Sequence, residues 1–183
     1  VLMGADRTEL LMSIFGAWQG KYSRELFVEG RKVEIGSPSD AIANGVGFVT
    51  EDRKRFGLIL EQTIMDNMTL AGLRMIVGKI LTNRTRELIA TRTPMSSLRI
   101  KANSPLTVAG TLSGGNQQKV IVAREFSRPI HLLIASQPTR GLDVGSIEYI
   151  HTQIIKKRDE GIGVLLVSSE LDEILALSDR IAV

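Results

Sequence analysis

The sequence predicts an α/β fold in which helices flank a mainly parallel sheet. Short apolar runs of strand length alternate with longer segments in which apolar residues recur at helical spacing. The run 131–135 and the amphipathic segment 145–160 are one such pair. Polar or glycine-containing turns at 4–8, 136–143 and 168–170 come directly after apolar runs. In a parallel sheet these turns lie at the carboxyl ends of the strands, where ligands bind.

Composition narrows the class of protein. The chain has 183 residues, about one domain, and its 43% hydrophobic and 23% charged residues are typical of a soluble globular protein. It has no cysteine and only two histidines, which leaves no material for disulfides or thiolate or histidine metal clusters. A net charge of +3 with 4% aromatic residues argues against nucleic-acid binding. No apolar run approaches the roughly 18 residues of a membrane span, so we expect a cytoplasmic protein.

Local signals place the elements of the first fifty residues. Ser37 and Pro38 mark a helix start and Gly45 its end, while Glu29-Gly30-Arg31 separates two alternating runs. We therefore expect the end of a strand at 1–3, a helix at 8–15 ending near Gly16, a hairpin at 24–35, a helix from Pro38, and a strand at 46–50.

The rest of the chain continues the alternation. We expect helices at 63–73, 79–96 (ended by Pro94), 145–160 and 170–177, strands at 131–135, 164–167 and 181–183, and an irregular stretch at 98–111.

The most informative segment is Leu112-Ser113-Gly114-Gly115-Asn116-Gln117-Gln118-Lys119, which opens an amphipathic helix. Ser113 is placed to cap that helix, and the glycines let another molecule approach the backbone N–H groups at the positive end of the helix dipole. For Ser-Gly-Gly alone, an ordinary capped helix whose glycines only make a turn is the favoured interpretation. The complete octapeptide resembles the signature motif of ABC-type ATPases, in the form carried by sugar-import ATPases.

Other motifs support this resemblance by their order along the chain. They are Gly4–Leu10, Glu51–Arg55, Gln137–Gly145 and Ser168–Leu171. The chain is most similar to the second nucleotide-binding domain of the two-domain ATPases for sugar (ribose- or xylose-type) or nucleoside import. Its apolar start without methionine and its end within an expected strand fit an N-terminally truncated domain. The resemblance implies core pieces at about 1–60 and 120–183, and a helical subdomain at about 61–119 that ends in the signature.

The resemblance also implies a site for ATP and Mg²⁺, in which several residues depart from the family pattern. The phosphate loop corresponds to Gly4, Ala5, Asp6, Arg7 and Thr8, and the γ-phosphate sensor to Glu51. The metal-holding Asp and the catalytic Glu are replaced by Ser136 and Gln137, and the switch His by Ser169. Neutral side chains cannot act as a carboxylate base, and Asp6 would face phosphate oxygens. Thr8 and Ser136 remain as weak metal ligands.

In ABC dimers each nucleotide lies between the phosphate loop of one domain and the signature of the other. By resemblance, Ser113, Gly114, Gly115 and Gln117 would contact a nucleotide held by the partner, and Asp143 would bridge the two halves. Our hypothesis is that this chain completes a partner's ATP site although its own is degenerate. Each departure alone is also compatible with neutral drift. A site that still binds nucleotide weakly is compatible with the changes at Ser136, Gln137 and Ser169.

The competing interpretation is a non-catalytic module for dimerisation and transport coupling that binds no nucleotide. Whether the chain itself hydrolyses ATP stays open. The resemblance further implies transmembrane permease subunits as partners, a solute-binding protein as an indirect partner, and a peripheral position on the cytoplasmic face of the cell membrane. A DNA-associated ABC ATPase is excluded, because too few residues separate Val49 from the signature for a long coiled-coil insertion.

Overall fold

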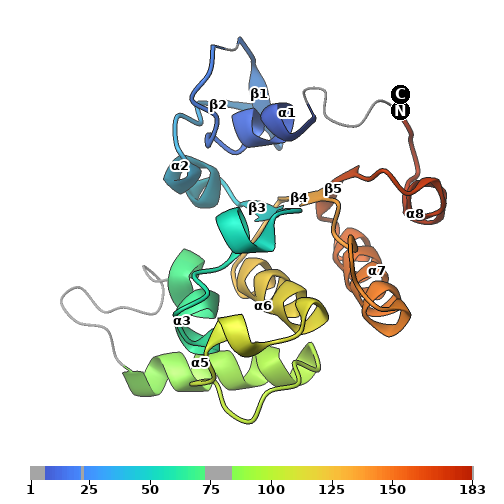
Figure 1. Cartoon of the computed structure of the whole chain (residues 1–183). Helices are drawn as coiled ribbons and strands as arrows, with labels where there is room; N and C mark the ends of the chain where they lie inside the picture. Colours follow the sequence, from blue (N-terminus) through green and yellow to red (C-terminus); the bar gives the residue numbers. More distant parts are fainter. Residues whose placement is uncertain (1–6, 22, 73–83, 183) are drawn as a thin grey trace. The chain divides into compact units, whose positions relative to one another are not determined.

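The computed structural model of the chain describes residues 7–21, 23–72 and 84–182 (Figure 1). Two units divide the chain: the first comprises 1–49, 130–138 and 148–183, and the second 50–129 and 139–147. The expected strand 1–3, the residues Gly4, Ala5 and Asp6, and the start of the expected helix 79–96 lie outside the described residues.

The first unit is built on a parallel sheet, as the sequence predicts. Its strands are β3 (Val46–Val49), β4 (Leu132–Ser136) and β5 (Gly163–Val167), paired in the order β3-β4-β5. Val46 lies opposite Leu132, and Leu132 opposite Gly163. The other elements of this unit are α1 (Arg7–Ile14), the hairpin β1 (Leu26–Val28) and β2 (Arg31–Val33), α2 (Pro38–Ala43) and α8 (Leu171–Leu177), with most of α7 (Val144–Asp159).

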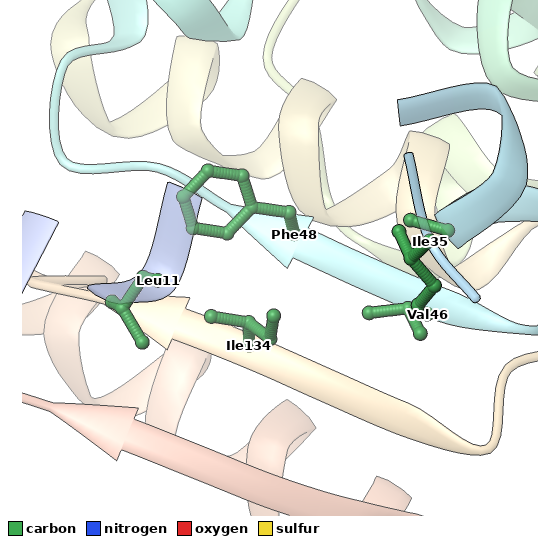
Figure 2. Close-up of a cluster of buried hydrophobic side chains, with 6 residues drawn as sticks. Leu11, Ile35, Val46, Phe48 and Ile134 are labelled. Atoms are coloured by element: carbon green, nitrogen blue, oxygen red, sulfur yellow. The ribbon is translucent and has the colours of Figure 1, made fainter. Parts of the chain in front are cut away.

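A cluster of buried apolar side chains joins α1 to the sheet (Figure 2). Leu11 comes from α1, Val46 and Phe48 from β3, and Ile134 from β4. Burying each such side chain contributes about 1.5–3 kcal/mol. This cluster fixes α1 against β4, and so it fixes where the N-terminus of α1 begins.

The turn signals of the first fifty residues are confirmed. The Ser37 hydroxyl accepts a hydrogen bond from the Asp40 N–H at 3.2 Å, and Pro38 is the first residue of α2. Glu29 and Gly30 both have positive φ, 50° and 74°, which is the geometry of a two-residue hairpin turn.

The second unit is helical. It contains the π-helix η1 (Arg53–Gly57), α3 (Ile64–Thr69), the 3₁₀ turns η2 (Leu70–Gly72) and η3 (Ala109–Thr111), α5 (Arg84–Ser97) and α6 (Gly114–Phe126). Helices α3, α5 and α6 pack against one another (Figure 1). Thr63 and Asp66 form a reciprocal capping box at the start of α3.

Two expectations about element ends are wrong. Pro94 does not end its helix, because α5 continues to Ser97 and buries Thr91 and Met95 on either side of the proline. That packing outweighs the hydrogen bond that proline removes from a helix. The expected last strand is absent at Ile181 and Ala182, since neither residue pairs with a strand in the described part of the chain. Among the described residues, no helix is long and apolar enough to span a membrane.

Replacing Gly16 by alanine should lower the free energy of unfolding by at least about 2 kcal/mol, measured by urea denaturation. Gly16 has φ 74°, and a Cβ built there would lie 2.7–2.8 Å from backbone atoms of Ser37, which cannot move aside cheaply. Gly30 is the matched control, because it has the same φ but no atom within 4 Å of its built Cβ. The change Gly30→Ala should therefore cost only the left-handed strain, about 1 kcal/mol. If both substitutions lowered the free energy of unfolding by the same amount, the clash with the Ser37 backbone would not explain the loss at Gly16.

Candidate functional site

The first candidate surface is the turn that opens α6 in the second unit. Ser113 holds the N-cap position with φ −61° and ψ 156°, and the first helical hydrogen bond runs from the Gln117 N–H to the Ser113 carbonyl at 2.9 Å. The N–H groups of Gly114, Gly115 and Asn116 thus precede the hydrogen-bond ladder and lie at the positive end of the helix dipole. Such a helix start is suited to an anion.

The expected side-chain cap at Ser113 is wrong. The Ser113 hydroxyl makes no capping hydrogen bond, and its Oγ instead accepts one from the Asn116 side-chain amide at 2.9 Å. The carbonyl oxygen of that amide accepts from the Lys101 N–H at 2.8 Å. Asn116 therefore orients the exposed Ser113 hydroxyl through a lone pair, so the hydroxyl hydrogen is not used by this bond.

Gln117, the remaining predicted ligand of the signature, lies elsewhere. Its side chain is buried, and its amide donates to the Ala109 carbonyl at 3.3 Å. The Gln117 side chain therefore supports the turn at Ala109 from the protein interior.

Gly115 brings the start of α6 close to the start of α7. The Asp143 carboxylate accepts from the Ser146 N–H at 3.0 Å and from its hydroxyl at 2.8 Å, which caps α7. A Cβ built at Gly115 would lie 2.5 Å from Ser146 Oγ and 3.2 Å from Asp143 Oδ2. Only glycine fits at 115 without moving this capping pair. The sequence interpretation missed Ser146, although an Asp three residues before a Ser at a helix start is a recognisable capping spacing.

The contacts around Asp143 and Lys119 shift the pKa values of these two side chains. The hydrogen bonds from Ser146 hold the pKa of the Asp143 carboxyl below its ordinary value. Burial lowers the pKa of the Lys119 ammonium, and the Asp143 carboxylate acts in the opposite direction. Asp143 is therefore ionised at neutral pH.

Glu51 contacts the loop between β4 and α7, within the second unit. Arg140 Nη1 lies 3.4 Å from Glu51 Oε2, and Arg53 Nη1 donates to the Arg140 carbonyl at 3.0 Å. The predicted sensor position therefore carries a carboxylate that is paired with an arginine of its own chain.

The second candidate surface lies at the carboxyl ends of β4 and β5 in the first unit. Ser136 is buried at the end of β4, and Gln137 follows in a left-handed conformation with φ 45°. Gln137 Oε1 accepts from both the N–H and the hydroxyl of Ser169, at 3.2 and 3.1 Å. The structure thus brings together the predicted catalytic and switch positions, as a pair of neutral side chains.

Ser136, Gln137 and Ser169 supply no carboxylate at the ends of these two strands. Mg²⁺ in proteins is held by carboxylates, phosphates and water, whereas Ser136 and Gln137 offer a hydroxyl and an amide oxygen that already accepts two hydrogen bonds. Neither group can take a proton from an attacking water. Arg7 and Thr8 form the first turn of α1, with Thr8 exposed to solvent.

Comparison with solved structures decides the fold. The chain matches a nucleotide-free ATP-binding cassette from an ABC transporter with a TM-score of 0.75 and 20% identity, over 97% of this chain and 72% of that one. It also matches the dimeric structure of MJ0796, a bacterial ABC transporter cassette, with a TM-score of 0.71 and 22% identity, over 93% of this chain and 73% of the other. The fold is that of an ATP-binding cassette. The predicted fold class is confirmed.

Curated relatives match this chain over its whole length. It is 41% identical to the xylose import ATP-binding protein XylG of Thermoanaerobacter pseudethanolicus. It is 44% identical to the L-arabinose transport ATP-binding protein AraG of Geobacillus stearothermophilus, and 43% identical to the ribose import ATP-binding protein RbsA of Bacillus cereus. The chain spans only 36% or 37% of the length of these relatives. No family model matches it. Its homologues are therefore ATP-binding proteins of sugar import.

Proposed function

We propose that this chain is an ATP-binding, energy-coupling part of an ABC importer for sugars, in which it completes a partner's ATP site through the turn Ser113–Gly115. The sequence left sugar import and nucleoside import as alternatives. The relatives support sugar import, since their names give xylose, arabinose and ribose. The dimeric cassette among the similar structures supports a second cassette, in the same polypeptide or in a dimer, as the direct partner.

The other partners follow from the same class of protein. An import ATPase works against transmembrane permease subunits on the cytoplasmic face of the membrane, and a solute-binding protein delivers the sugar to that permease. We place the chain there as a peripheral subunit.

One observation carries the asymmetry of this proposal. The start of α6 presents backbone N–H groups and an oriented serine hydroxyl, whereas the ends of β4 and β5 present the neutral pair Gln137–Ser169. The first surface suits a terminal phosphate, and the second lacks the carboxylates that hold Mg²⁺ and activate water. The domain therefore serves the site of its partner better than its own.

The stoichiometry of nucleotide binding tests the proposal. When this chain is assembled with its partner cassette and titrated with MgATP, equilibrium dialysis should give a single tight site per pair. The physical reason is that the partner's phosphate loop and the Ser113 turn make one complete site, while the other lacks its metal-holding acids.

The other outcomes are equally informative. Two tight sites would overturn the asymmetry, because the chain's own phosphate loop would then be competent. No site at all would favour the alternative function, a dimerisation and coupling module that binds no nucleotide.

A further inference from the structure

A π-helix follows the Glu51 position and is held in place at its start. In η1, the Asp52 carboxylate caps the helix by accepting from the Lys54 and Arg55 N–H groups at 3.2 and 3.0 Å. Single π-turns occur frequently at functional sites. Arg53 directly follows the capping residue and is the first residue of the π-helix.

The Arg53 guanidinium lies between two segments of the candidate signature surface. One end of its fork, Nη1, donates to the Arg140 carbonyl at 3.0 Å. The other end, Nη2, lies 3.5 Å from a Cβ built at Gly114 and 3.9 Å from one built at Gly141. The planar fork therefore spans the loop 140–141 and the first residue of α6.

The far end of the same π-helix is tied to the same helix α6. Arg124 Nη1 donates to the Gly57 carbonyl at 2.6 Å, and Arg124 Nε pairs with the buried Glu125 at 2.8 Å. The segment 53–57 is thus anchored to α6 near the C-terminus of that helix, while Arg53 reaches its N-terminus. The segment 53–57 therefore has hydrogen bonds both to α6, through Arg124, and to the 140–141 loop, through the Arg140 carbonyl.

We propose that Arg53 is a positioning residue for the signature turn: it holds the start of α6 and the loop before Asp143 in the geometry that grips the phosphate of a partner-held nucleotide. This inference rests on the function proposed above. Arginine is needed because its rigid fork reaches two places at once, which the single ammonium of lysine cannot do.

The predicted effect is on turnover more than on nucleotide binding. The partner's phosphate loop holds most of the ATP, so a misplaced signature turn weakens contacts that tighten as the terminal phosphate reacts. In the assembled importer, Arg53→Met should lower kcat for MgATP about tenfold and change KM less than twofold, measured by steady-state ATPase assay. Arg53→Lys should recover part of the loss, because it keeps the charge and one donor.

The matched control is Arg92→Met, on the exposed side of α5, which should keep both constants within about twofold of the parent. The inference is overturned if Arg53→Met keeps the parental kcat. It is also overturned if the loss in Arg53→Met equals the fall in folded protein measured by thermal melting and Arg53→Lys recovers nothing. Failure of the proposed function is distinguishable, because then a blocked Ser113 turn would also leave the ATPase unchanged.

Discussion

Ser113→Asp should reduce the ATPase activity of the assembled pair by at least about 100-fold while leaving this domain folded. Aspartate is a good N-cap residue and its charge is favourable at the start of α6, so the stability of the domain should be equal or higher. The same carboxylate would face the terminal phosphate of the partner-held nucleotide. Two unit charges about 4 Å apart at an effective dielectric of 20 repel by about 4 kcal/mol, which exceeds the 2.7 kcal/mol of a 100-fold loss.

Two variants accompany this measurement. Ser113→Thr keeps the hydroxyl and adds no charge, and it should retain activity within about fivefold. Gln137→Ala changes the neutral pair at the ends of β4 and β5 and should leave turnover within about twofold, because that pair is not part of the competent site. If Gln137→Ala abolished activity while Ser113→Asp did not, the roles assigned to the two surfaces would be reversed.

Local chemistry was enough to predict the elements that end in special turns. Ser37, Pro38 and Gly45 bound α2 because capping, a preset φ and a left-handed end act within a few residues of one another. The parallel pairing of β3, β4 and β5 was also predicted, since buried apolar runs alternate with helical segments.

The misses have a common physical cause, which is tertiary packing. The helix α5 continues past Pro94 because Thr91 and Met95 are buried, and burial is invisible to a rule about proline. Ser113 makes no capping bond, and its Oγ accepts instead from Asn116, which is itself held by the Lys101 backbone. The bond between Arg53 and Arg140 joins residues 87 apart, so no local pattern could indicate it.

The candidate site, like the fold, could be predicted from the sequence only in part. The meeting of Gln137 and Ser169 followed from their places at the ends of adjacent parallel strands. The packing demand at Gly115 did not follow, because it depends on how closely α6 approaches Ser146.

Gly115→Ala should lower the ATPase activity of the assembled pair by about 100-fold, because a displacement of a contacting group by 1 Å costs roughly that factor. Its Cβ would lie 2.5 Å from Ser146 Oγ, so Ser146 must turn away and break its 2.8 Å bond to Asp143, or α6 must shift. Either response disturbs the turn that approaches the nucleotide. The overpacking should also lower the free energy of unfolding by about 1–3 kcal/mol, measured by urea denaturation.

Gly114→Ala is the matched control, because the two neighbouring glycines differ in what their added Cβ would meet. At Gly114 the nearest atom is Arg53 Nη2 at 3.5 Å, an ordinary contact with the end of a flexible side chain. The free energy of unfolding of Gly114→Ala should therefore stay within about 0.5 kcal/mol of the parent. The double change Gly115→Ala with Ser146→Ala removes the obstructing hydroxyl and should regain stability, while the Asp143 cap keeps its bond from the backbone N–H of residue 146. If Gly115→Ala kept the parental ATPase activity, the close approach of α6 to α7 would have no part in holding the nucleotide.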